Sequence, residues 1–504
     1  MSEGGFLLGI DIGTSSAKAV FMDASGRVVG SGRRAYPIDS PVVGYAEQSP
    51  DMWWNAAVCA VREGLDSARK NSRGGAPVAA VSFSGQMHGF AALGSDGRPL
   101  RPAIIWADQR GIDEAAAING AISEVGVGRT CNRASAGFML TSLMWLKKRE
   151  RAVMERVSAV LQPKDYICFR MTGRKVSEPT DAAGTCAYDV RDGGWNHALI
   201  DALGLPREIF PEIVPTGSVV GAVSREAAEE TGLAPGTPVV AGAADQPAGA
   251  LGNGVCEFGT LSSTIGTAGQ IFAPITAPVY DKHLRTNTFI HAVPGLWYIL
   301  GANLSAGYCL EWLRKNANIS GEYGRLDDRA ARVPAGSRGV VFLPYLFGDR
   351  TPHQDARARA AFFGLAGGTG TDEMIRAVME GVVFSMAEGM ELACELGARP
   401  EIVIASGGGA RSRLWRQIQA DIYGIPVTRS AAGEQTCAGA AVLAASGIGF
   451  YPDISSACRA MTRASDETEI PDMEAHAVYM ELFKIYKELY ERNKELFPKL
   501  ADFA

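Results

Sequence analysis

The chain has 504 residues, of which 47% are hydrophobic and 21% are charged, and its formal net charge is −6. This length exceeds what one compact core accommodates and predicts roughly two to four domains. The acidic balance argues against a nucleic acid or an anionic membrane surface as the main partner. The nine cysteines stand singly, without a CxxC pair, so they indicate neither a disulfide framework nor a zinc site, and we expect a reduced compartment.

The sequence shows no targeting or membrane-spanning segment. Its N-terminus lacks a basic region and has too short an apolar run for a signal peptide. The long uncharged stretches Phe258–Tyr280 and Thr286–Leu310 are broken by Gly, Asn, Thr and Pro, which is not typical of a membrane span. We therefore expect a cytoplasmic protein. The sequence does not determine the oligomeric state, and a homodimer is the assembly that we consider.

The predicted elements of the first half begin with a meander of strands joined by tight turns. A long helix with apolar positions at helical spacing comes next, and the region from 115 to 171 is mostly helical in pattern. The elements are strands at Phe6–Ile12, Ala17–Met22, from Arg27, at Ala76–Ser84 and at Val239–Gly242, and a helix at Asp51–Lys70.

The second half begins again after Asn253 with a similar pair of strands. Predicted strands lie at Leu261–Thr267, Gln270–Ala273, Val340–Tyr345 and Ile402–Ala405. Predicted helices lie at Asp372–Leu396, Leu414–Tyr423 and Ala438–Ala445, and Val478–Leu496 is predicted as a solvated C-terminal helix.

The phrase IGT occurs once in each half, at Ile12–Thr14 and at Ile265–Thr267. Two such short matches arise either by chance or from two domains with related cores. In the second copy Thr264 stands where Asp11 stands in the first. We expect two closely coupled domains, residues 1–253 and 254–504, with a cleft between them.

Several turns have the composition of a phosphate-binding site, although the GxxxxGK[ST] and GxGxxG patterns are absent from the sequence. A tight turn between strands presents backbone N–H groups, and small hydroxyl side chains add donors. Glycines at a strand end allow a nucleotide to approach the backbone closely. The candidates are the turn of Gly13, Thr14 and Ser15 with Lys18 as a cation, the facing turn of Gly266 and Thr267, and the glycine run that includes Gly408 and Gly409.

Asp11 precedes the first of these turns, where a bare carboxylate would repel a phosphate. A carboxylate that holds hydrated Mg²⁺ attracts phosphate instead, because the ion inverts the local electrostatics. The alternative is that the side chain of Asp11 caps the adjacent turn. Spacing alone does not separate these two interpretations.

Three further positions are candidates for binding or chemistry. His88 follows a strand and could bond a substrate hydroxyl, or it could be a structural histidine. Asp245 stands among small apolar residues as a candidate general base, or as the N-cap of a helix. Trp106, with Asp108 and Arg110 close behind it, could form a sugar-binding wall, or the two charges could be an ordinary surface ion pair.

From Leu7 to Tyr451 the chain resembles the FGGY family of carbohydrate kinases, and its motifs occur in the family's order. One of them, SGQMHG, favours D-xylulose over glycerol as the sugar. The motifs are GIDIGTSSAKAVF, SGQMHG, IIWADQR, PKDYICFRMTG, SEPTDAAGT, GAADQPAGALGNG, FLPYLFGDRTPH and SGGGARSRLWRQIQADIYGIPV.

The resemblance implies an α/β fold of two actin- and hexokinase-like (ribonuclease H-like) domains, each with a mixed sheet, around an interdomain cleft. It implies phosphorylation of D-xylulose to D-xylulose 5-phosphate, with ATP and Mg²⁺. Ribulose and L-xylulose are the nearest rival substrates. An actin-like ATPase switch or filament protein is the alternative from another class, although such a switch needs no sugar site.

The resemblance also implies roles for individual residues. Asp245 would take the proton from the substrate's 5-hydroxyl, and Asp11 would act near Mg²⁺ and the phosphates. The sugar would meet Met87, His88, Asp245 and Gln246, with Trp106 as a further wall. The transferring phosphoryl group would face Gly13, Thr14, Ser15 and Lys18, and the nucleotide would meet Gly266, Thr267, Gly408, Gly409 and Ser412.

The sequence departs from the family pattern at three places. Ala107 stands where relatives often have Asn or Ser, and Ala243–Ala244 stand where a Gly pair is common. Gln435–Cys437 replace a turn that is richer in Gly and Ala. None of these changes removes a proposed catalytic group, but they leave the sugar less determined than the reaction.

Overall fold

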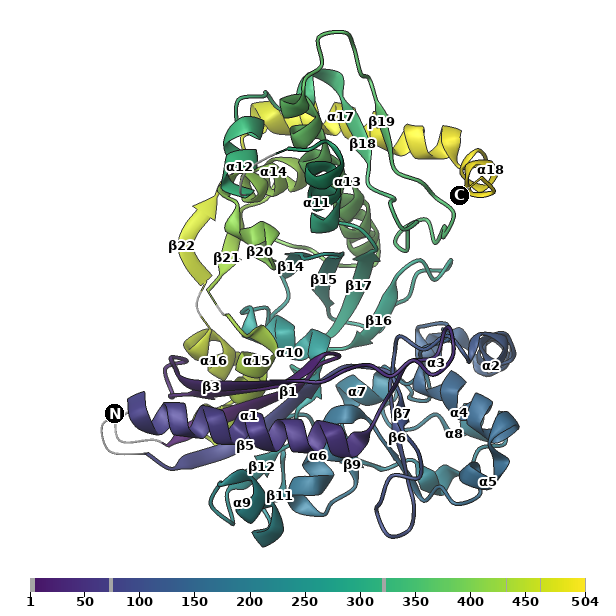
Figure 1. The fold of residues 1–504 in the computed structure, drawn as a ribbon, viewed down its shortest axis with the longest axis vertical. Helices are drawn as coiled ribbons and strands as arrows, with labels where there is room; N and C mark the ends of the chain where they lie inside the picture. Colours follow the sequence, from purple (N-terminus) through teal and green to yellow (C-terminus); the bar gives the residue numbers. More distant parts are fainter. Residues whose placement is uncertain (1–4, 72–75, 320–322, 432, 463, 504) are drawn as a thin grey trace.

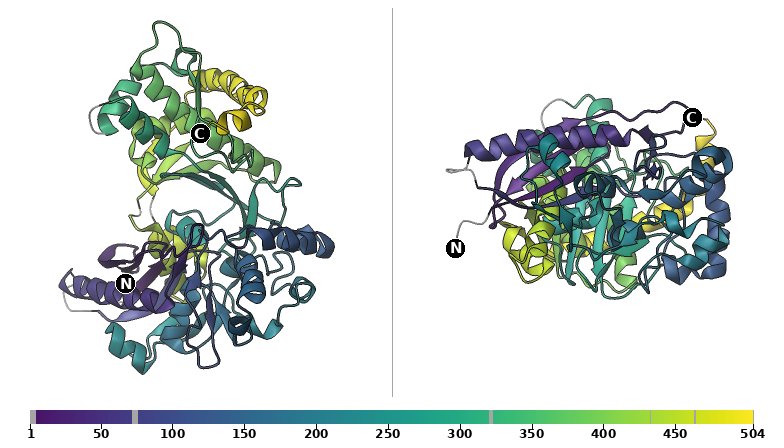
Figure 2. Two further views of the ribbon diagram at one scale, coloured as in Figure 1. Left: turned by 45° about the vertical axis from the view of Figure 1, so that its right-hand side comes forward. Right: turned by 90° about the horizontal axis from the view of Figure 1, so that it is seen from below.

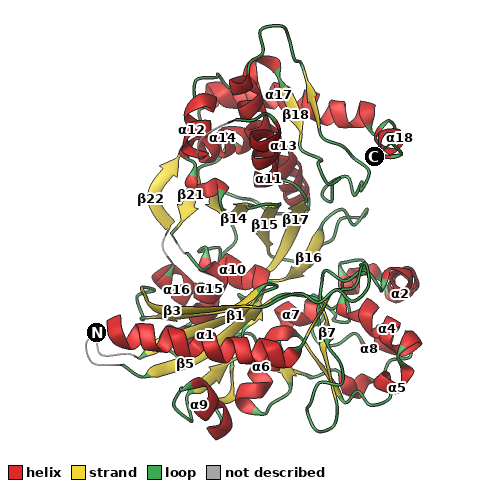
Figure 3. Ribbon diagram, in the orientation of Figure 1, coloured by secondary structure: helices red, strands yellow, loops and turns green. Residues whose placement is uncertain are grey.

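The computed structural model describes residues 5–71, 76–319, 323–431, 433–462 and 464–503. Two mixed β-sheets form the centres of two α/β halves, one above the other in Figure 1. Helices that belong to both parts of the chain lie between the two groups of strands (Figure 3). The expectation of a two-domain α/β fold with a mixed sheet in each domain is confirmed.

The first sheet grows from the predicted N-terminal meander. Strands β1 and β2 are antiparallel, whereas β1 and β5 are parallel, so β1 lies in the centre and is buried throughout. The order is β11 (Val219–Ala222), β12 (Pro238–Val240), β5 (Val78–Gly85), β1 (Phe6–Ile12), β2 (Ser16–Met22) and β3 (Val28–Ala35), with β13 (Ala243–Ala244) beside the end of β5.

The second sheet repeats this arrangement. Strand β14 is antiparallel to β15 and parallel to β20, as β1 is to β2 and β5. The order is β16 (Asn287–Ile290), β17 (Trp297–Asn303), β15 (Gly269–Ile275), β14 (Thr260–Ile265), β20 (Ile402–Ser406), β21 (Val427–Ser430) and β22 (Ala464–Glu469).

The repeated turn phrase therefore marks a repeated core. Asp11 lies opposite Ser84 on the parallel neighbour, and Thr264 lies opposite Ser406 in the same way. The two IGT phrases begin at the ends of β1 and β14, where each strand turns back into its antiparallel partner. This shared register excludes chance as the explanation of the repeat.

Helices cover both faces of the first sheet. Helix α1 (Pro50–Asn71) packs on β2 and β3, and α6 (Pro163–Thr172) packs beside it. Helices α10 (Asp245–Gly252) and α15 (Gln435–Gly447) cover the other face (Figure 1). The second sheet packs on α11 (Gly307–Asn316), α13 (Thr371–Glu395) and α14 (Arg413–Tyr423).

Helices α15 and α16 (Ile454–Met461) are late in sequence but share a core with the first sheet. Val442 and Leu443 of α15 and Ile454 of α16 belong to the same apolar cluster as Leu7 and Val20. The division of the chain at residue 253 stays a prediction, and these two helices lie across it.

A helical layer follows β7 (Ala103–Ile104) and lies beside the first sheet, seen in blue in both views of Figure 2. Its members are α2 (Ile112–Val125), α3 (Val127–Thr130), α4 (Met139–Arg149), α5 (Arg151–Met154), α7 (Pro179–Ala183) and α8 (His197–Ala202). The predicted helical region contains one short strand, β8 (Ala159–Leu161), which pairs with β6 (Ala91–Leu93).

The sequence predicted a solvated helix near the C-terminus, and this prediction is wrong for one face of α17 (Met473–Asn493). One face buries Tyr479, Phe483, Tyr486 and Tyr490 against the second core. Within the part of the chain that the structure describes, no helix is long and apolar enough to cross a membrane.

Candidate active site

A cavity of about 390 Å³ lies between the two halves of the chain, and residues from both halves line it. Near its base it meets a smaller cavity of about 150 Å³, with which it shares Asp245, Gln246 and Gln270. The larger cavity is lined by Thr14, Met87, His88, Trp106, Gln109, Ser135, Ala136, Gly137, Phe138, Asp245, Gln246, Gln270, Asn287, Phe289, Leu300 and Arg350.

Asp245 is the acid at the junction of the two cavities. Helix α10 begins at Asp245, with Ala244 in the N-cap position, so the alternative in which Asp245 is itself the N-cap is wrong. Burial and the nearby charge of Asp11 raise the pKa of Asp245 to about 7, and the amide of Gln246 offsets part of that rise. A carboxyl group with this pKa is suited to accept a proton near neutral pH.

His88 contributes a hydrogen-bond acceptor to the larger cavity. Its ring stacks on Phe138, with 4.1 Å between centroids, and Nδ1 lies 2.6 Å from the carbonyl oxygen of Gly184. Because a carbonyl only accepts, Nδ1 carries the proton, which leaves Nε2 as an acceptor. Burial lowers the pKa of His88 to about 4, so the ring is neutral at pH 7. Met87, the preceding residue, lines the same wall.

Asp11 lies at the end of β1 and is buried, with one unsatisfied oxygen. Burial raises its pKa, whereas Lys18 and the side chains of Thr436 and Ser84 lower it in part. Within the described ranges its Oδ1 has no hydrogen-bond partner. Asp11 lines neither cavity, but its charge lies close enough to Asp245 to raise the pKa of that carboxyl.

Lys18 lies directly across from Asp11 in the β1–β2 ladder. Its Nζ is 2.6 Å from Oε2 of Glu434, the residue before α15. The ion pair joins strand β2 of the first sheet to the residue that precedes α15, a helix of the second half that packs on the first sheet. In this state the amine of Lys18 is bonded to a carboxylate of the protein.

The turn of Gly13, Thr14 and Ser15 projects to the cavity as a β-hairpin. The N–H of Gly13 donates to the carbonyl of Ser16, which closes the turn, and the side chain of Ser15 is exposed. The hydroxyl of Thr14 accepts a 2.9 Å hydrogen bond from Nε1 of Trp106. This bond holds the half-exposed indole over the cavity beside the hairpin.

The residues of the motif that contains Trp106 have two different roles: some line the cavity, and others form buried contacts behind it. Trp106 and Gln109 line the cavity, whereas Asp108 and Arg110 form a buried ion pair at 2.7 Å. Arg110 also reaches Glu47, again at 2.7 Å. The alternative of an ordinary surface ion pair is therefore wrong, because both charged groups are almost fully buried.

The two predicted nucleotide turns lie against each other in the second half. Gly407 has φ +78°, and a Cβ there would lie 2.5 Å from the carbonyl oxygen of Ile265, so only glycine allows this approach. Gly266 and the exposed Thr267 follow Ile265, and Gly408 and Gly409 follow Gly407. Ser412 is engaged as the N-cap of α14, where its hydroxyl accepts from the N–H of Trp415 at 3.0 Å.

The second half contributes five cavity residues that were not among the candidates predicted from the sequence. They are Gln270, Asn287, Phe289, Leu300 and Arg350. Arg350 belongs to the motif FLPYLFGDRTPH, and an arginine in a family motif is a signal that could have identified it. The other four stand on the β-strands β15, β16 and β17, where the sequence pattern reports only a buried strand.

The fit of a divalent cation depends on Asp11. Its unsatisfied buried oxygen suits Mg²⁺, which proteins hold through one or two carboxylates while phosphates and water complete the shell. Among the described residues, no three His, Cys, Asp or Glu side chains gather closely enough to hold a metal ion by themselves.

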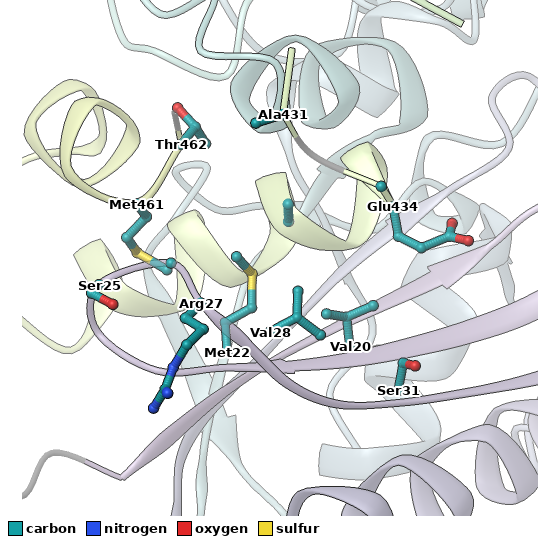
Figure 4. A pocket seen from close by; sticks show the side chains of 13 residues that line it. Val20, Met22, Ser25, Arg27, Val28, Ser31, Ala431, Glu434, Met461 and Thr462 are labelled. Carbon is teal, nitrogen blue, oxygen red and sulfur yellow. The ribbon is translucent and has the colours of Figure 1, made fainter. Parts of the chain in front are cut away.

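A separate cavity of about 580 Å³ lies on the β2–β3 side of the first half. Figure 4 shows Val20, Met22 and Val28 extending from the hairpin, with Met461 of α16 opposite them. None of the predicted site residues lines this cavity, although Glu434, the partner of Lys18, does.

Comparison with known proteins agrees with this geometry. Residues 6–252 match the N-terminal domain, and residues 261–448 the C-terminal domain, of the FGGY family of carbohydrate kinases. The xylulose kinase of Bacillus subtilis (strain 168) is 32% identical over 458 residues, which cover 91% of this chain and 91% of that protein. The gluconokinase of the same organism is 30% identical over 451 residues, which cover 87% of this chain and 86% of that protein.

The same fold is present in solved structures. The crystal structure of xylulose kinase from Rhodospirillum rubrum has a TM-score of 0.90 to this chain at 32% identity, and the match covers 98% of this chain and 99% of that one. Two matched domains along most of the chain, and a cavity lined from both halves, characterise an enzyme that uses a sugar and ATP as substrates. The chain belongs to the FGGY family of carbohydrate kinases.

Proposed function

We propose that the enzyme phosphorylates D-xylulose at its 5-hydroxyl with ATP, giving D-xylulose 5-phosphate. The observation that carries the proposal is Asp245, an acid with a pKa of about 7 at the junction of two cavities. The larger cavity has room and polar groups for a five-carbon sugar. Similarity to xylulose kinases over nine tenths of the chain supports this substrate.

Asp245 acts as the general base in this proposal. It takes the proton of the 5-hydroxyl while the hydroxyl oxygen forms a bond to the γ-phosphorus of ATP, and the bond from that phosphorus to the bridging oxygen of ADP breaks. Phosphoryl transfer requires that the attacking and leaving oxygens are aligned with the phosphorus and that the charge on the phosphoryl oxygens is stabilised. The N-terminus of α10 holds Asp245 at the base of the sugar cavity.

The sugar is oriented by groups of both halves. The free Nε2 of His88 accepts from a sugar hydroxyl, and Gln246 offers both a donor and an acceptor. Met87 and Trp106 supply apolar surface for the C–H faces of the sugar. Asn287 of the second half completes the polar wall.

The phosphates face the hairpin of the first half in this proposal. Asp11 would hold Mg²⁺, which when bound supplies positive charge for the phosphoryl oxygens. Thr14 and Ser15 bind the phosphoryl group through the hairpin, with Gly13 as the turn residue. Lys18 joins them when it leaves Glu434. Gly266, Thr267, Gly408, Gly409 and Ser412 form the nucleotide side.

Arg350 favours D-gluconate as a second candidate substrate. The guanidinium lines the sugar cavity, and no described residue forms an ion pair or hydrogen bond with it. Arginine pairs well with carboxylates, and D-gluconate carries one where xylulose does not. The gluconokinase similarity supports the same candidate. Ribulose and L-xylulose stay as rivals, and an actin-like switch would release ADP without any sugar.

A coupled assay of ADP release separates these functions. We expect rapid ADP formation with D-xylulose and much slower formation with D-ribulose, L-xylulose, D-gluconate and glycerol. A preference for D-gluconate that is lost in Arg350→Gln would establish the second candidate. Sugar-independent ADP release from folded protein would contradict both sugar kinase proposals.

The role of Asp245 is tested by Asp245→Ala. We expect turnover to fall by about 10²–10⁴-fold, because general-base catalysis contributes about that much, while ATP still binds. Calorimetric titration with ATP checks that binding. Near-normal turnover in this variant would exclude Asp245 as the base.

A homodimer and the division into residues 1–253 and 254–504 are also proposals. Light scattering at micromolar concentration measures the mass of the assembly directly. A mass near that of one 53.3 kDa chain would contradict the dimer.

A further inference from the structure

A buried charge cluster lies behind the sugar cavity and touches neither cavity. Lys164 of α6 is 1% exposed, and its Nζ lies 2.5 Å from Asp165, 3.3 Å from Glu178 and 3.2 Å from Asp181. Asp165, Glu178 and Asp181 are buried as well. Burying such a group is costly unless its members are paired and hydrogen-bonded, so its contacts indicate what it holds in place.

One contact of the cluster leads to Asp245. Glu178 precedes α7, and its Oε1 accepts a 2.7 Å hydrogen bond from the hydroxyl of Thr180. A carboxylate only accepts, so the hydroxyl of Thr180 must donate its proton to Glu178. The lone pairs of the Thr180 oxygen are then available to accept a hydrogen bond. They accept the N–H of Ala244 at 2.9 Å, and Ala244 is the residue before Asp245.

A second contact leads to His88 through the other end of α7. The N–H of Gly184 donates to the carbonyl of Asp181 at 2.9 Å. The carbonyl of Gly184 in turn accepts from Nδ1 of His88 at 2.6 Å. The short helix α7 thus connects the buried cluster to the backbone of the acid and to the ring that faces the sugar.

We propose that Thr180 is a positioning residue of the kinase: its hydroxyl, aligned by Glu178, holds the backbone of Ala244 so that the Asp245 carboxylate meets the acceptor hydroxyl. This inference rests on the proposed function, because it assigns Asp245 the role of base. Ala244 occupies the N-cap of α10, where N–H groups lack an intrahelical partner. Without the hydroxyl of Thr180 this N–H has no acceptor, and the start of α10 is free to shift.

The test compares three variants of the full-length enzyme. Thr180→Val removes the hydroxyl at nearly constant volume, and we expect kcat to fall by about 10–100-fold, because small misplacements of catalytic groups have effects of that size. The KM for ATP should stay unchanged. Thr180→Ser restores the hydroxyl and should recover kcat to within about threefold of the wild type, on the scale of a weakened but retained hydrogen bond.

Thr216→Val is the matched control. The hydroxyl of Thr216 donates to Oε2 of the same Glu178 at 2.6 Å, whereas the N–H of Ala244 donates to Thr180. Its loss removes one hydrogen bond to Glu178, so it should lower the thermal midpoint no more than Thr180→Val does and leave kcat unchanged. Equal losses of kcat in both variants would reduce Thr180 to a structural residue and overturn the proposal.

Hydrogen exchange in the wild-type enzyme keeps the proposal testable if Thr180→Val does not fold. The Ala244 amide should be protected, whereas an N-cap amide without an acceptor exchanges quickly. Rapid exchange at Ala244 would overturn the proposal. If Asp245→Ala is inactive and Thr180→Val is fully active, the positioning role of Thr180 is wrong but Asp245 can still be the base. If Asp245→Ala is active, Asp245 is not the base, and the proposed function fails at that point.

Discussion

At the scale of single residues, the environment of two acids decides the chemistry. Asp11 and Asp245 are both desolvated, and the charge of Asp11 disfavours ionisation of Asp245. Only Asp11 has Lys18 beside it, so Asp11 is the acid whose charge is partly compensated. The difference suits a cation-holding role for Asp11 and a proton-accepting role for Asp245.

The raised pKa of Asp245 predicts the pH dependence of turnover. A base must be ionised, and the pKa of this carboxyl is shifted upward from its ordinary value, 3.8, to about 7. Activity should therefore be full above pH 8 and fall tenfold per unit below pH 7, with an acidic limb near 7. A profile of kcat/KM for the sugar from pH 5 to 9 measures it, and a limb near pH 4 would contradict the pKa.

His88 predicts a defect that is specific for the sugar. His88→Asn keeps a residue that tolerates the observed φ of +72° but removes the ring and its Nε2 acceptor. The KM for the sugar should rise by about tenfold, corresponding to one lost hydrogen bond, and the KM for ATP should not change. Steady-state kinetics with each substrate varied in turn measures both, and equal rises in both constants would indicate general damage.

At the scale of elements, the contact between β1 and α15 joins distant parts of the chain. A Cβ on Gly9 would lie 1.9 Å from the carbonyl oxygen of Cys437, so the helix crosses the strand where only glycine fits. The sequence predicted a helix at Ala438–Ala445, where every residue is buried, but it did not indicate that its partner is the first strand. That partner is fixed by a packing contact across more than 400 residues.

Gly9→Ala should consequently destabilise the protein. Overpacking at a close backbone contact costs about 1–3 kcal/mol. Gly120→Ala is the control, because a Cβ on Gly120 in α2 meets nothing within 4 Å and an exposed helical glycine gains roughly 0.5–1 kcal/mol on this change. Urea midpoints should move in opposite directions, and equal midpoints would contradict the close approach.

At the scale of the whole molecule, residues of both halves of the chain form the sugar cavity, and we expect the halves to close over a bound sugar. His88 and Asp245 come from the first half, whereas Asn287 and Arg350 come from the second. A sugar that contacts both sides favours a closed state, and closure excludes water that would otherwise accept the phosphoryl group. The ion pair of Lys18 with Glu434 lies where the second half returns to the first.

Closure predicts a smaller molecule in the ternary complex. D-xylulose together with a non-hydrolysable ATP analogue should lower the radius of gyration in small-angle scattering, and the analogue alone should lower it less. The physical reason is that the sugar adds contacts with both walls of its cavity to those that the analogue alone can make. An unchanged radius in the ternary complex would contradict hinge closure.

Local pattern was sufficient for much of this architecture. Strand β1 and helix α1 lie within a few residues of their predicted bounds, because burial of apolar runs and helical spacing are local signals. The same signals could have shown the buried face of α17, since Tyr479, Phe483, Tyr486 and Tyr490 recur at helical spacing.

The sequence by itself determined the order of the family motifs, the strand that carries Asp11, and His88 and Asp245 as candidate polar groups, but it left the repeated IGT phrase open to chance. Only the tertiary structure decided that the core is repeated, that Asp245 and His88 meet in one cavity, that Lys18 pairs with Glu434, and that Arg350 joins the sugar wall. Burial in the folded protein raises the pKa of Asp245, and folding brings the hydroxyl of Thr180 within hydrogen-bond distance of the N–H of Ala244. The reason is physical: strand and helix formation depend on neighbours in sequence, whereas desolvation, charge coupling and hydrogen-bond partners depend on groups that folding brings together from distant segments.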